Sequence, residues 1–138
     1  MGDWQHFGHG ADIGVRGRGS TLAKAFAAAA VGLTAVVTDP AQVNPLESVH
    51  VECTVPDREL LLHEWLNSLV FLMATRRMLF SRFDVRVAGD RLEADAWGEP
   101  IDVARHAPAV EVKGATLTEL AVRKEPDGRW LAQCVVDV

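Results

Sequence analysis

Two aspartates near opposite ends of the chain have surroundings that suit metal chemistry. Asp12 stands between apolar residues in the run ADIG, and Asp137 closes a nearly apolar stretch beside the terminal carboxylate of Val138. Adjacent carboxylates repel each other unless a cation or donor compensates, and oxygen-only ligands suit Ca²⁺ or Mg²⁺ rather than zinc. The alternatives are a turn-forming Asp12 that bonds its own backbone and a solvated chain end at Asp137. The residues alone do not pair Asp12 with Asp137.

Two further pairs of polar side chains have spacings that permit chemistry. His6 and His9, three residues apart, can share a metal if other ligands come from elsewhere in the chain. Asp102 and His106 lie in the run GEPIDVARHAP and can form a loop acid–base pair. In both cases ordinary turn or surface chemistry is the favoured interpretation.

Common catalytic motifs are missing from the sequence. The pair His63-Glu64 is followed by Asn67, so the zinc-protease pattern H-E-x-x-H is incomplete, and G-x-S-x-G does not occur. The run GVRGRGST lacks the Lys of a Walker loop. We interpret it as a glycine-punctuated turn before a helix, whose N-terminus can hold an anion beside Arg16 or Arg18. A plain turn with a helix cap is the alternative.

The composition is that of one ordinary globular domain, expected over residues 1–138. Apolar residues make up 49% and charged residues 24%, which excludes a disordered tail, a collagen-like fibre and a disulfide-dense miniprotein. A chain of this length buries enough surface to form a real core. The formal net charge of −5 argues against nucleic acid as the main direct partner and against binding to anionic membranes.

The start of the chain and the cysteines indicate the compartment. The first residues show no basic, apolar leader, and no apolar run approaches the ~20 residues of a membrane span. Cys53 and Cys134 form no CxxC pair and lie in alternating apolar stretches, so we expect both as small core residues. The expected location is the cytoplasm.

Two segments have the periodicity of amphipathic helices. The first is predicted over residues 22–37, with Ser20 or Thr21 as its N-cap and Asp39-Pro40 beyond its end. The second begins after Asp57, a good N-cap, and carries a wide apolar arc. We therefore expect the second helix to be the more buried of the two.

The remaining segments alternate with the period of β-strands. Strands are predicted at residues 49–55, 83–87, 92–96, 110–112, 116–124 and 130–138, with turns at 89–90 and 126–128. A loop is predicted over residues 98–108. Two helices and several antiparallel hairpins predict an α+β fold, with the helices packed on a mostly antiparallel sheet.

Taken in order, segments along the whole chain resemble the archease family. The start WQHFGHGADIGVRGRG is similar to the family signature, in which His-Thr-Ala-Asp-Ile-Gly follows an aromatic and histidine-containing start. The similarity continues through LLLHEWLNSLVFL, WGEPID, the segment around His106, EVKGAT and the closing WLAQCVVDV. Each piece is modest alone, and together they are specific.

The resemblance implies an accessory protein with no catalytic activity of its own. Archeases activate the RtcB-type RNA ligase of tRNA splicing and RNA repair, which joins phosphate-ended RNA to 5′-hydroxyl RNA with GTP and a metal. The family is expected to promote guanylylation of the ligase and multiple turnover. It also implies a divalent cation, expected to be calcium, with magnesium or manganese as alternatives. The implied ligands are Asp12, Asp137 and Val138, and candidates for a supporting role are His9, Asp102 and His106.

The chain departs from the family pattern at three places. Gly10 stands where Thr is usual, Gly114 where Ala is common, and Leu117-Thr118 where the family often has Tyr-His. The first change can loosen the loop that carries Asp12, and the last removes an aromatic ring and a histidine.

Two other functions compete with the ligase activator. A general protein chaperone or remodelling factor is the main alternative, and it requires an exposed apolar patch. A small metal-dependent hydrolase built on Asp12, Asp137 and His9 is the third hypothesis. No nucleophile with an adjacent base supports the hydrolase.

Overall fold

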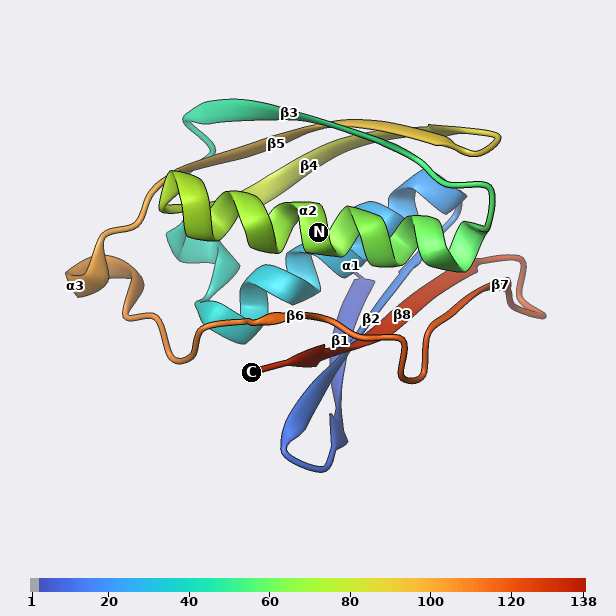
Figure 1. Cartoon of the computed structure of the whole chain (residues 1–138), viewed down its shortest axis with the longest axis horizontal. Coiled ribbons are helices and arrows are strands. Elements are labelled where there is room, and N and C mark those ends of the chain that lie inside the picture. The colour runs from blue at the N-terminus through green and yellow to red at the C-terminus, as the bar shows by residue number, and fades with distance from the viewer. Residues whose placement is uncertain (1–2) are drawn as a thin grey trace.

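The computed structural model describes residues 3–138, which fold into two antiparallel sheets around two long helices (Figure 1). One sheet has the strand order β1-β2-β8-β6, with β7 also paired to β8, and the other has the order β3-β5-β4. The elements in chain order are β1 (Asp3–His9), β2 (Asp12–Gly19), α1 (Leu22–Val37), a 3₁₀ turn η1 (Pro40–Gln42), β3 (Glu47–Thr54), α2 (Arg58–Arg76), β4 (Met78–Ala88), β5 (Arg91–Pro100), α3 (Val103–His106), β6 (Gly114–Ala115), β7 (Ala121–Lys124) and β8 (Trp130–Asp137).

The helices α1 and α2 form the middle layer of the molecule. Figure 1 shows the β3-β5-β4 sheet above them and the larger sheet below them. Every paired strand runs antiparallel to its neighbour. The predicted α+β class, with helices packed against antiparallel strands, is confirmed, and the structure divides the strands between two sheets.

Local sequence signals set the helix starts where they were predicted. The Thr21 hydroxyl caps α1 by accepting a hydrogen bond from the Lys24 backbone N–H at 3.1 Å. Asp57 caps α2 by accepting from the N–H groups of Glu59 and Leu60 at 2.9 and 3.0 Å. These bonds satisfy backbone donors that have no partner inside the helix.

The prediction that the second helix is the more buried one is wrong. α1 buries ten of its 16 residues, whereas α2 buries five of 19. α1 packs against strands of both sheets, and its small alanines allow close approach. α2 keeps one flank at the surface, where Phe71 is 64% exposed.

The glycine-rich run after Asp12 is a strand and not the predicted turn. It forms β2, in which Gly17 and Gly19 lie against α1 and Gly14 lies under the Phe7 ring of β1. A Cβ atom on Gly17 would lie 2.3 Å from the backbone nitrogen of Ala29 and 2.6 Å from the carbonyl oxygen of Ala25. Because Gly17 has no side chain, the α1 backbone can lie directly against the sheet.

The segment between residues 98 and 124 also differs from its prediction. β5 continues to Pro100 and α3 follows, where a loop was predicted. The predicted strand at 110–112 is absent from the described chain, and the one at 116–124 shrinks to β7. Outside β6 and β7, isolated backbone hydrogen bonds hold this segment. The Ala109 N–H donates to the Val37 carbonyl at 2.8 Å, and the Thr116 N–H donates to the Val135 carbonyl at 3.0 Å.

The core lies between the sheets and is centred on the two helices. Trp65 is fully buried on α2, donates to the Phe26 carbonyl at 3.1 Å and meets the Phe83 ring edge-on at 6.0 Å. Cys53 and Cys134 are buried free thiols, as predicted. Burial raises the pKa of Cys134 to about 11, so this thiol stays protonated and unreactive at neutral pH.

The close approach of β2 and α1 gives a stability prediction. Gly17→Ala forces a methyl group against the α1 backbone, and we expect it to lower the free energy of unfolding by about 1–3 kcal/mol. Urea denaturation measures this change. Gly8→Ala is the matched control, because nothing lies within 4 Å of a Cβ atom at that position. Equal stability of the two variants would contradict the packing role of Gly17.

Candidate metal site at the end of the sheet

Antiparallel pairing brings His9, Asp12 and Asp137 into one row across three strands. His9 is paired with Asp12 in the β1–β2 hairpin. Ile13 of β2 faces Val136 of β8, so the next position in the same register places Asp12 opposite Asp137. Opposed residues share one face of a sheet, with Cβ atoms about 4.5–5.5 Å apart. We call these three residues the carboxylate row.

Hydrogen bonds from the other side fix the position of Asp137. Lys113 N–H donates to the Asp137 carbonyl at 2.7 Å, and the next two residues form β6 along the end of β8. β6 is in turn tied to α2. Asn67 Oδ1 accepts from the Ala115 N–H at 2.8 Å, and His63 Nε2 lies 3.1 Å from the Ala115 carbonyl. His63, and Asn67, which stands where the zinc-protease pattern needs its second His, therefore have a structural role.

The donor set of the row fits a hard cation. Asp12 and Val138 are half-buried, whereas Asp137 and His9 are exposed. Within residues 3–138, neither Asp12 nor Asp137 has a Lys, Arg or His within ion-pair distance. Two carboxylates without a cationic neighbour repel each other, and a divalent ion relieves that repulsion. His9 shares the register of the row, but the ligand atoms of His9, Asp12 and Asp137 do not all lie within 4.8 Å of one another in the described residues.

The departures from the family pattern leave the row in place. Gly10 has a φ of +62°, the left-handed region that favours glycine, so it tightens the turn before Asp12. A Cβ atom on Gly114 would lie 3.3 Å from Oδ1 of Asn67, close to the bond that holds β6. Leu117 is 63% exposed and makes no contact with the row that the structure records.

The structure does not bring His6 and His9 together. Residues three apart on a strand point to opposite faces of the sheet. His6 Nε2 lies 2.8 Å from the Gly32 carbonyl of α1, and its ring is 4.9 Å from the ring of Trp4. His6 and His9 therefore do not form the shared metal site that their spacing permits.

Asp102 and His106 belong to a different network, built around Glu99. The Asp102 N–H donates to Nδ1 of His106 at 2.8 Å, so the remaining proton of this imidazole lies on Nε2. Nε2 then donates to Glu99 Oε2 at 2.9 Å. The Asp102 side chain caps α3 through the Arg105 N–H at 3.2 Å. These bonds anchor α3 to β5 and assign both predicted residues a structural role.

Glu99 is the residue of this network that the sequence did not single out. Its side chain is only 6% exposed, and it accepts from the Asn44 N–H at 2.8 Å. The Asn44 bond, with those from His106 and Arg105, lowers the pKa of Glu99 to about 2. A buried carboxylate with three donors is a stable anion and not a proton donor at neutral pH. Glu99 stands in a predicted loop, where alternation gives no sign of burial.

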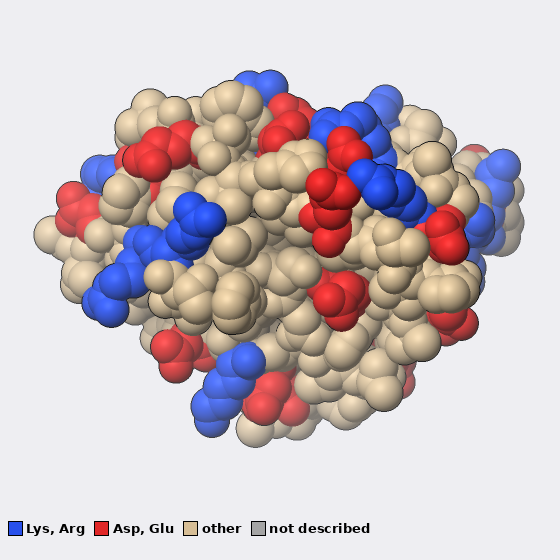
Figure 2. All heavy atoms as spheres, turned by 45° about the horizontal axis from the view of Figure 1, so that its top comes forward, with Lys and Arg blue, Asp and Glu red and all other residues tan. Residues whose placement is uncertain are grey.

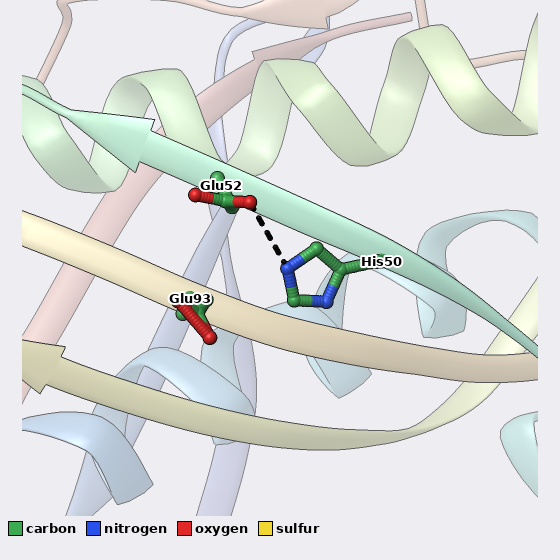
Figure 3. Close-up of side chains that lie close together, drawn as sticks. All are labelled: His50, Glu52 and Glu93. Carbon is green, nitrogen blue, oxygen red and sulfur yellow. Dashed lines mark ion pairs between the residues drawn. The ribbon is translucent and has the colours of Figure 1, made fainter.

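A second possible ligand group lies on the outer face of the smaller sheet. His50 and Glu52 of β3 and Glu93 of β5 offer ligand atoms within 4.8 Å of one another (Figure 3). In residues 3–138 it is the one group of three His, Cys, Asp or Glu side chains this close. The sequence shows these residues only as the solvated half of two alternating strands.

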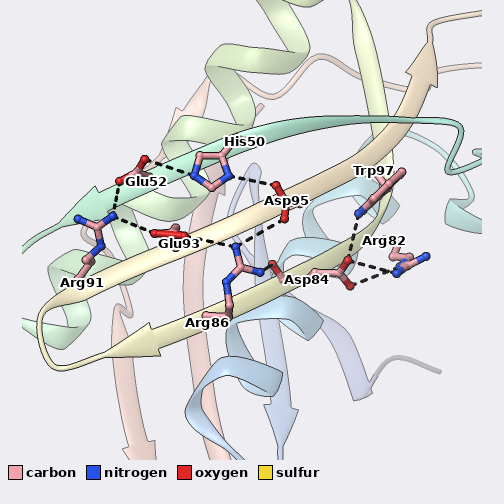
Figure 4. A network of polar contacts seen from close by, with 9 residues as sticks. All are labelled: His50, Glu52, Arg82, Asp84, Arg86, Arg91, Glu93, Asp95 and Trp97. Atoms are coloured by element: carbon pink, nitrogen blue, oxygen red, sulfur yellow. Dashed lines mark hydrogen bonds and ion pairs between the residues drawn. The ribbon is translucent and has the colours of Figure 1, made fainter.

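A cation already occupies the space between the two glutamates of this group. Arg91 NH2 lies 2.5 Å from Glu52 and 2.8 Å from Glu93, as Figure 4 shows. Figure 2 shows that acidic and basic side chains alternate over this face. The group is therefore part of a cross-strand charge ladder: His50, Glu52, Arg82, Asp84, Arg86, Arg91, Glu93, Asp95 and Trp97.

Comparisons of the sequence identify its relatives. Residues 4–138 match the family model described as the Archease protein family (MTH1598/TM1083). The chain is 44% identical to "Protein archease" of Thermococcus gammatolerans and 38% identical to that of Pyrococcus abyssi, in each case over 100% of both chains.

Two solved structures share the fold. The solution structure of Methanobacterium thermoautotrophicum protein 1598 covers 98% of both chains, with a TM-score of 0.85 and 33% sequence identity. A Thermotoga maritima protein described as an archease and possible chaperone covers 97% of this chain and 96% of its own, with a TM-score of 0.64. At 14% identity, this second likeness concerns the fold alone.

The charge ladder gives a prediction for His50. The Asp95 hydrogen bond at 3.0 Å raises the pKa of His50 above 6.5. Because the pKa of His50 is raised in the folded protein, its protonated form stabilises the fold. This contribution is complete below pH 6.5 and is lost as the pH rises through the pKa of the folded state. The Asp95→Asn substitution should bring the pKa of His50 back toward 6.5, as measured by NMR titration of the imidazole.

The matched control for His50 is Asp84→Asn, in the same ladder. Asp84 contacts Arg82 and Trp97 at 3.2 and 3.1 Å and makes no recorded contact with His50. Its substitution should leave the pKa of His50 as in the wild type. A wild-type pKa at or below 6.5 would show that Asp95 does not hold the imidazolium.

Proposed function

The chain belongs to the archease family, and from this premise we propose that it is an accessory activator of an RtcB-type RNA ligase. In this role it promotes guanylylation of the ligase and allows each ligase molecule to turn over repeatedly in tRNA splicing and RNA repair. It does no chemistry on RNA by itself. The observation that carries the proposal is the carboxylate row, where two acids without a cationic partner lie at one end of the sheet.

The proposed ligands of a divalent ion are Asp12, Asp137 and the terminal carboxylate of Val138. All three donors are oxygens, which suits a hard cation, and calcium is the ion that the family resemblance implies, with magnesium or manganese as alternatives. His9 lies beside Asp12 and supports the site. Asp102 and His106, offered as supporting residues, act on α3 instead. A bound ion supplies positive charge that stabilises phosphate oxygens during nucleotidyl transfer.

The chain's own residues orient the donors of this site. β6 and β2 bond to the two edges of β8, so Asp137 has a fixed position before any ion arrives. The ion then acts in one of two ways. It is presented to the nucleotide site of the ligase, or it joins the C-terminal strand to the β1–β2 turn and stiffens a docking surface.

Charge and hydropathy support a protein partner. With a net charge of −5, the chain can dock on a basic RNA-handling enzyme without competing for RNA, and no stable direct nucleic-acid binding is proposed. No helix in residues 3–138 has the length and apolar character needed to cross a membrane. We propose that the ligase is met in the cytoplasm.

A general chaperone is the alternative function, and the Thermotoga maritima protein is described as a possible chaperone. Exposed large apolar side chains are its structural support, and Leu46, Phe71 and Val103 are 70%, 64% and 71% exposed. They lie before β3, on α2 and on α3, and so do not share one element. A chaperone would suppress aggregation of unrelated proteins, which a dedicated ligase activator would not.

Calcium binding to the row gives a stability prediction. At a free Ca²⁺ concentration of 100 times Kd, binding should raise the free energy of unfolding by about 2.7 kcal/mol. Asp12→Asn and Asp137→Asn should each remove most of this gain, as measured by urea denaturation with Ca²⁺ and with EDTA. Glu47→Gln removes an exposed acid from β3 and should keep the gain. Equal stabilisation of all variants would place the ion elsewhere.

A ligation time course tests the activation itself. RNA ends are supplied in excess over the RtcB-type ligase of the same organism, with and without this protein. The expected result is that joined RNA per ligase rises well above one with the wild type and with Glu47→Gln, and stays near one with Asp137→Asn. Unchanged turnover with the wild type would reject the activator in favour of the chaperone.

The same variant separates the two roles of the ion. If Asp137→Asn still folds and binds the ligase but fails to promote guanylylation, the ion does more than stiffen the docking surface. If ligase binding is lost together with guanylylation, the structural role of the ion is sufficient.

A further inference from the structure

A basic cavity lies on the flank of α1, away from the carboxylate row. It has a volume of about 680 Å³ and is lined by residues of α1, β4 and the ends of β1 and β2. Asp3 and Arg18 mark the open end of the β1–β2 hairpin, whereas His9 and Asp12 are at its turn. The cavity therefore cannot share ligands with the proposed metal site.

The lining of this cavity is positively charged although the chain is acidic. Arg18, Lys24, Arg82 and Arg129 line it, and Asp3 is the one acid among the lining residues. Each of the three arginines is held by a carboxylate, since Arg18 pairs with Glu125 at 2.7 Å, Arg82 with Asp84 at 3.2 Å and Arg129 with Asp3 at 2.6 Å. A guanidinium has five N–H donors, so these contacts orient the arginines and leave donors for a ligand.

Lys24 and the start of α1 add charge without a counter-ion. Lys24 Nζ contacts the Ser20 hydroxyl at 3.3 Å, and no carboxylate in residues 3–138 lies within ion-pair distance of it. The first turn of α1 contains no acidic residue. The helix dipole therefore adds its positive end to the cationic side chains at the rim of the same cavity.

One part of the cavity wall is apolar, and Ser20 and Ser81 also line the cavity. Ala27, Ala28 and Val31 of α1 face Phe83 of β4 across it. A cavity of this volume is in the range of sites that hold small organic ligands. Free phosphate would contact the cationic side but would leave the apolar wall in water. The shape and lining favour a ligand with both a phosphorylated and an apolar part.

We propose that this cavity binds the polyphosphate group of a small organic phosphate, such as a nucleoside triphosphate. Arg18, Lys24, Arg82 and Arg129 take the phosphoryl oxygens, and the apolar part of the ligand lies on Val31 and Phe83. Charge-assisted N–H···O bonds are the strongest hydrogen bonds available for this recognition. The proposal concerns a second site and does not depend on ligase activation.

Isothermal titration calorimetry at constant ionic strength tests this site with three probes: pyrophosphate, GTP and guanosine. Pyrophosphate and GTP should bind at one site per chain, and guanosine should not bind. Lys24→Ala and Arg82→Ala should each raise the Kd of both phosphorylated probes about tenfold, the loss of one charge-assisted bond. Tighter binding of GTP than of pyrophosphate identifies a nucleotide as the source of the phosphates, and equal binding identifies the phosphate group alone.

Lys124→Ala is the matched control, because Lys124 is an exposed lysine that does not line the cavity. Its Kd for both probes should equal that of the wild type. Equal weakening by Lys24→Ala and Lys124→Ala would overturn the proposal, since only general attraction to cations would remain. Absence of binding by the folded wild-type protein would also overturn it. Circular dichroism of every variant checks the fold, and none of these outcomes depends on a ligase.

Discussion

The burial of β8 on both faces is the constraint on which the rest of the structure depends. All residues from 131 to 136 are buried, and the strand is paired with β2 on one edge and with β6 and β7 on the other. Cys134 belongs to the helical core, and at the edge shared with β6 and β7 the Val135 N–H donates to the Thr118 carbonyl at 3.2 Å. Displacing β8 would expose apolar surface, which costs about 25 cal/mol of free energy for each Å² exposed to water. Asp137, the first exposed residue of the strand, is therefore held at a fixed point.

Local signals predicted the two long helices and several strands, whereas β1, β2 and α3 were not predicted. Non-local contacts decided what the sequence could not show. The helix over 22–37 and the cap at Asp57 depend on neighbouring residues and were predicted correctly. Gly17 was misinterpreted because its reason is a helix that packs against it from outside the strand. The pairing of Asp12 with Asp137 was implied only by family resemblance, because strand register is set by partners far away in the chain. Glu99 was missed because it stands in a predicted loop, where alternation gives no sign of burial, and one of its donors, Asn44, is 55 residues away.

Charges are arranged in three different ways on this one acidic protein. In the ladder over β3, β5 and β4, each acid lies next to a cation, so the surface is locally balanced. In the carboxylate row, two acids lack such a neighbour. In the cavity beside α1, cations outnumber acids among the lining residues, and Lys24 is the lining cation without a carboxylate partner within residues 3–138. Balanced charges mainly keep a sheet face soluble, whereas uncompensated ones attract ligands of opposite sign. The net charge of −5 alone indicates neither the carboxylate row nor the cavity beside α1.

The pairing of β2 with β8 also sets the order in which the protein can be completed during synthesis. β1, β2 and α1 are adjacent in the chain, so their contacts are local and are available before β8 has been made. The second edge of β2 then has no partner, because Arg16 and Gln133, which pair across these strands, are separated by 117 residues. An open strand edge invites pairing with other chains. The nascent protein is thus most prone to aggregate in the interval before its final strand emerges, and fast translation of the closing segment shortens that exposure.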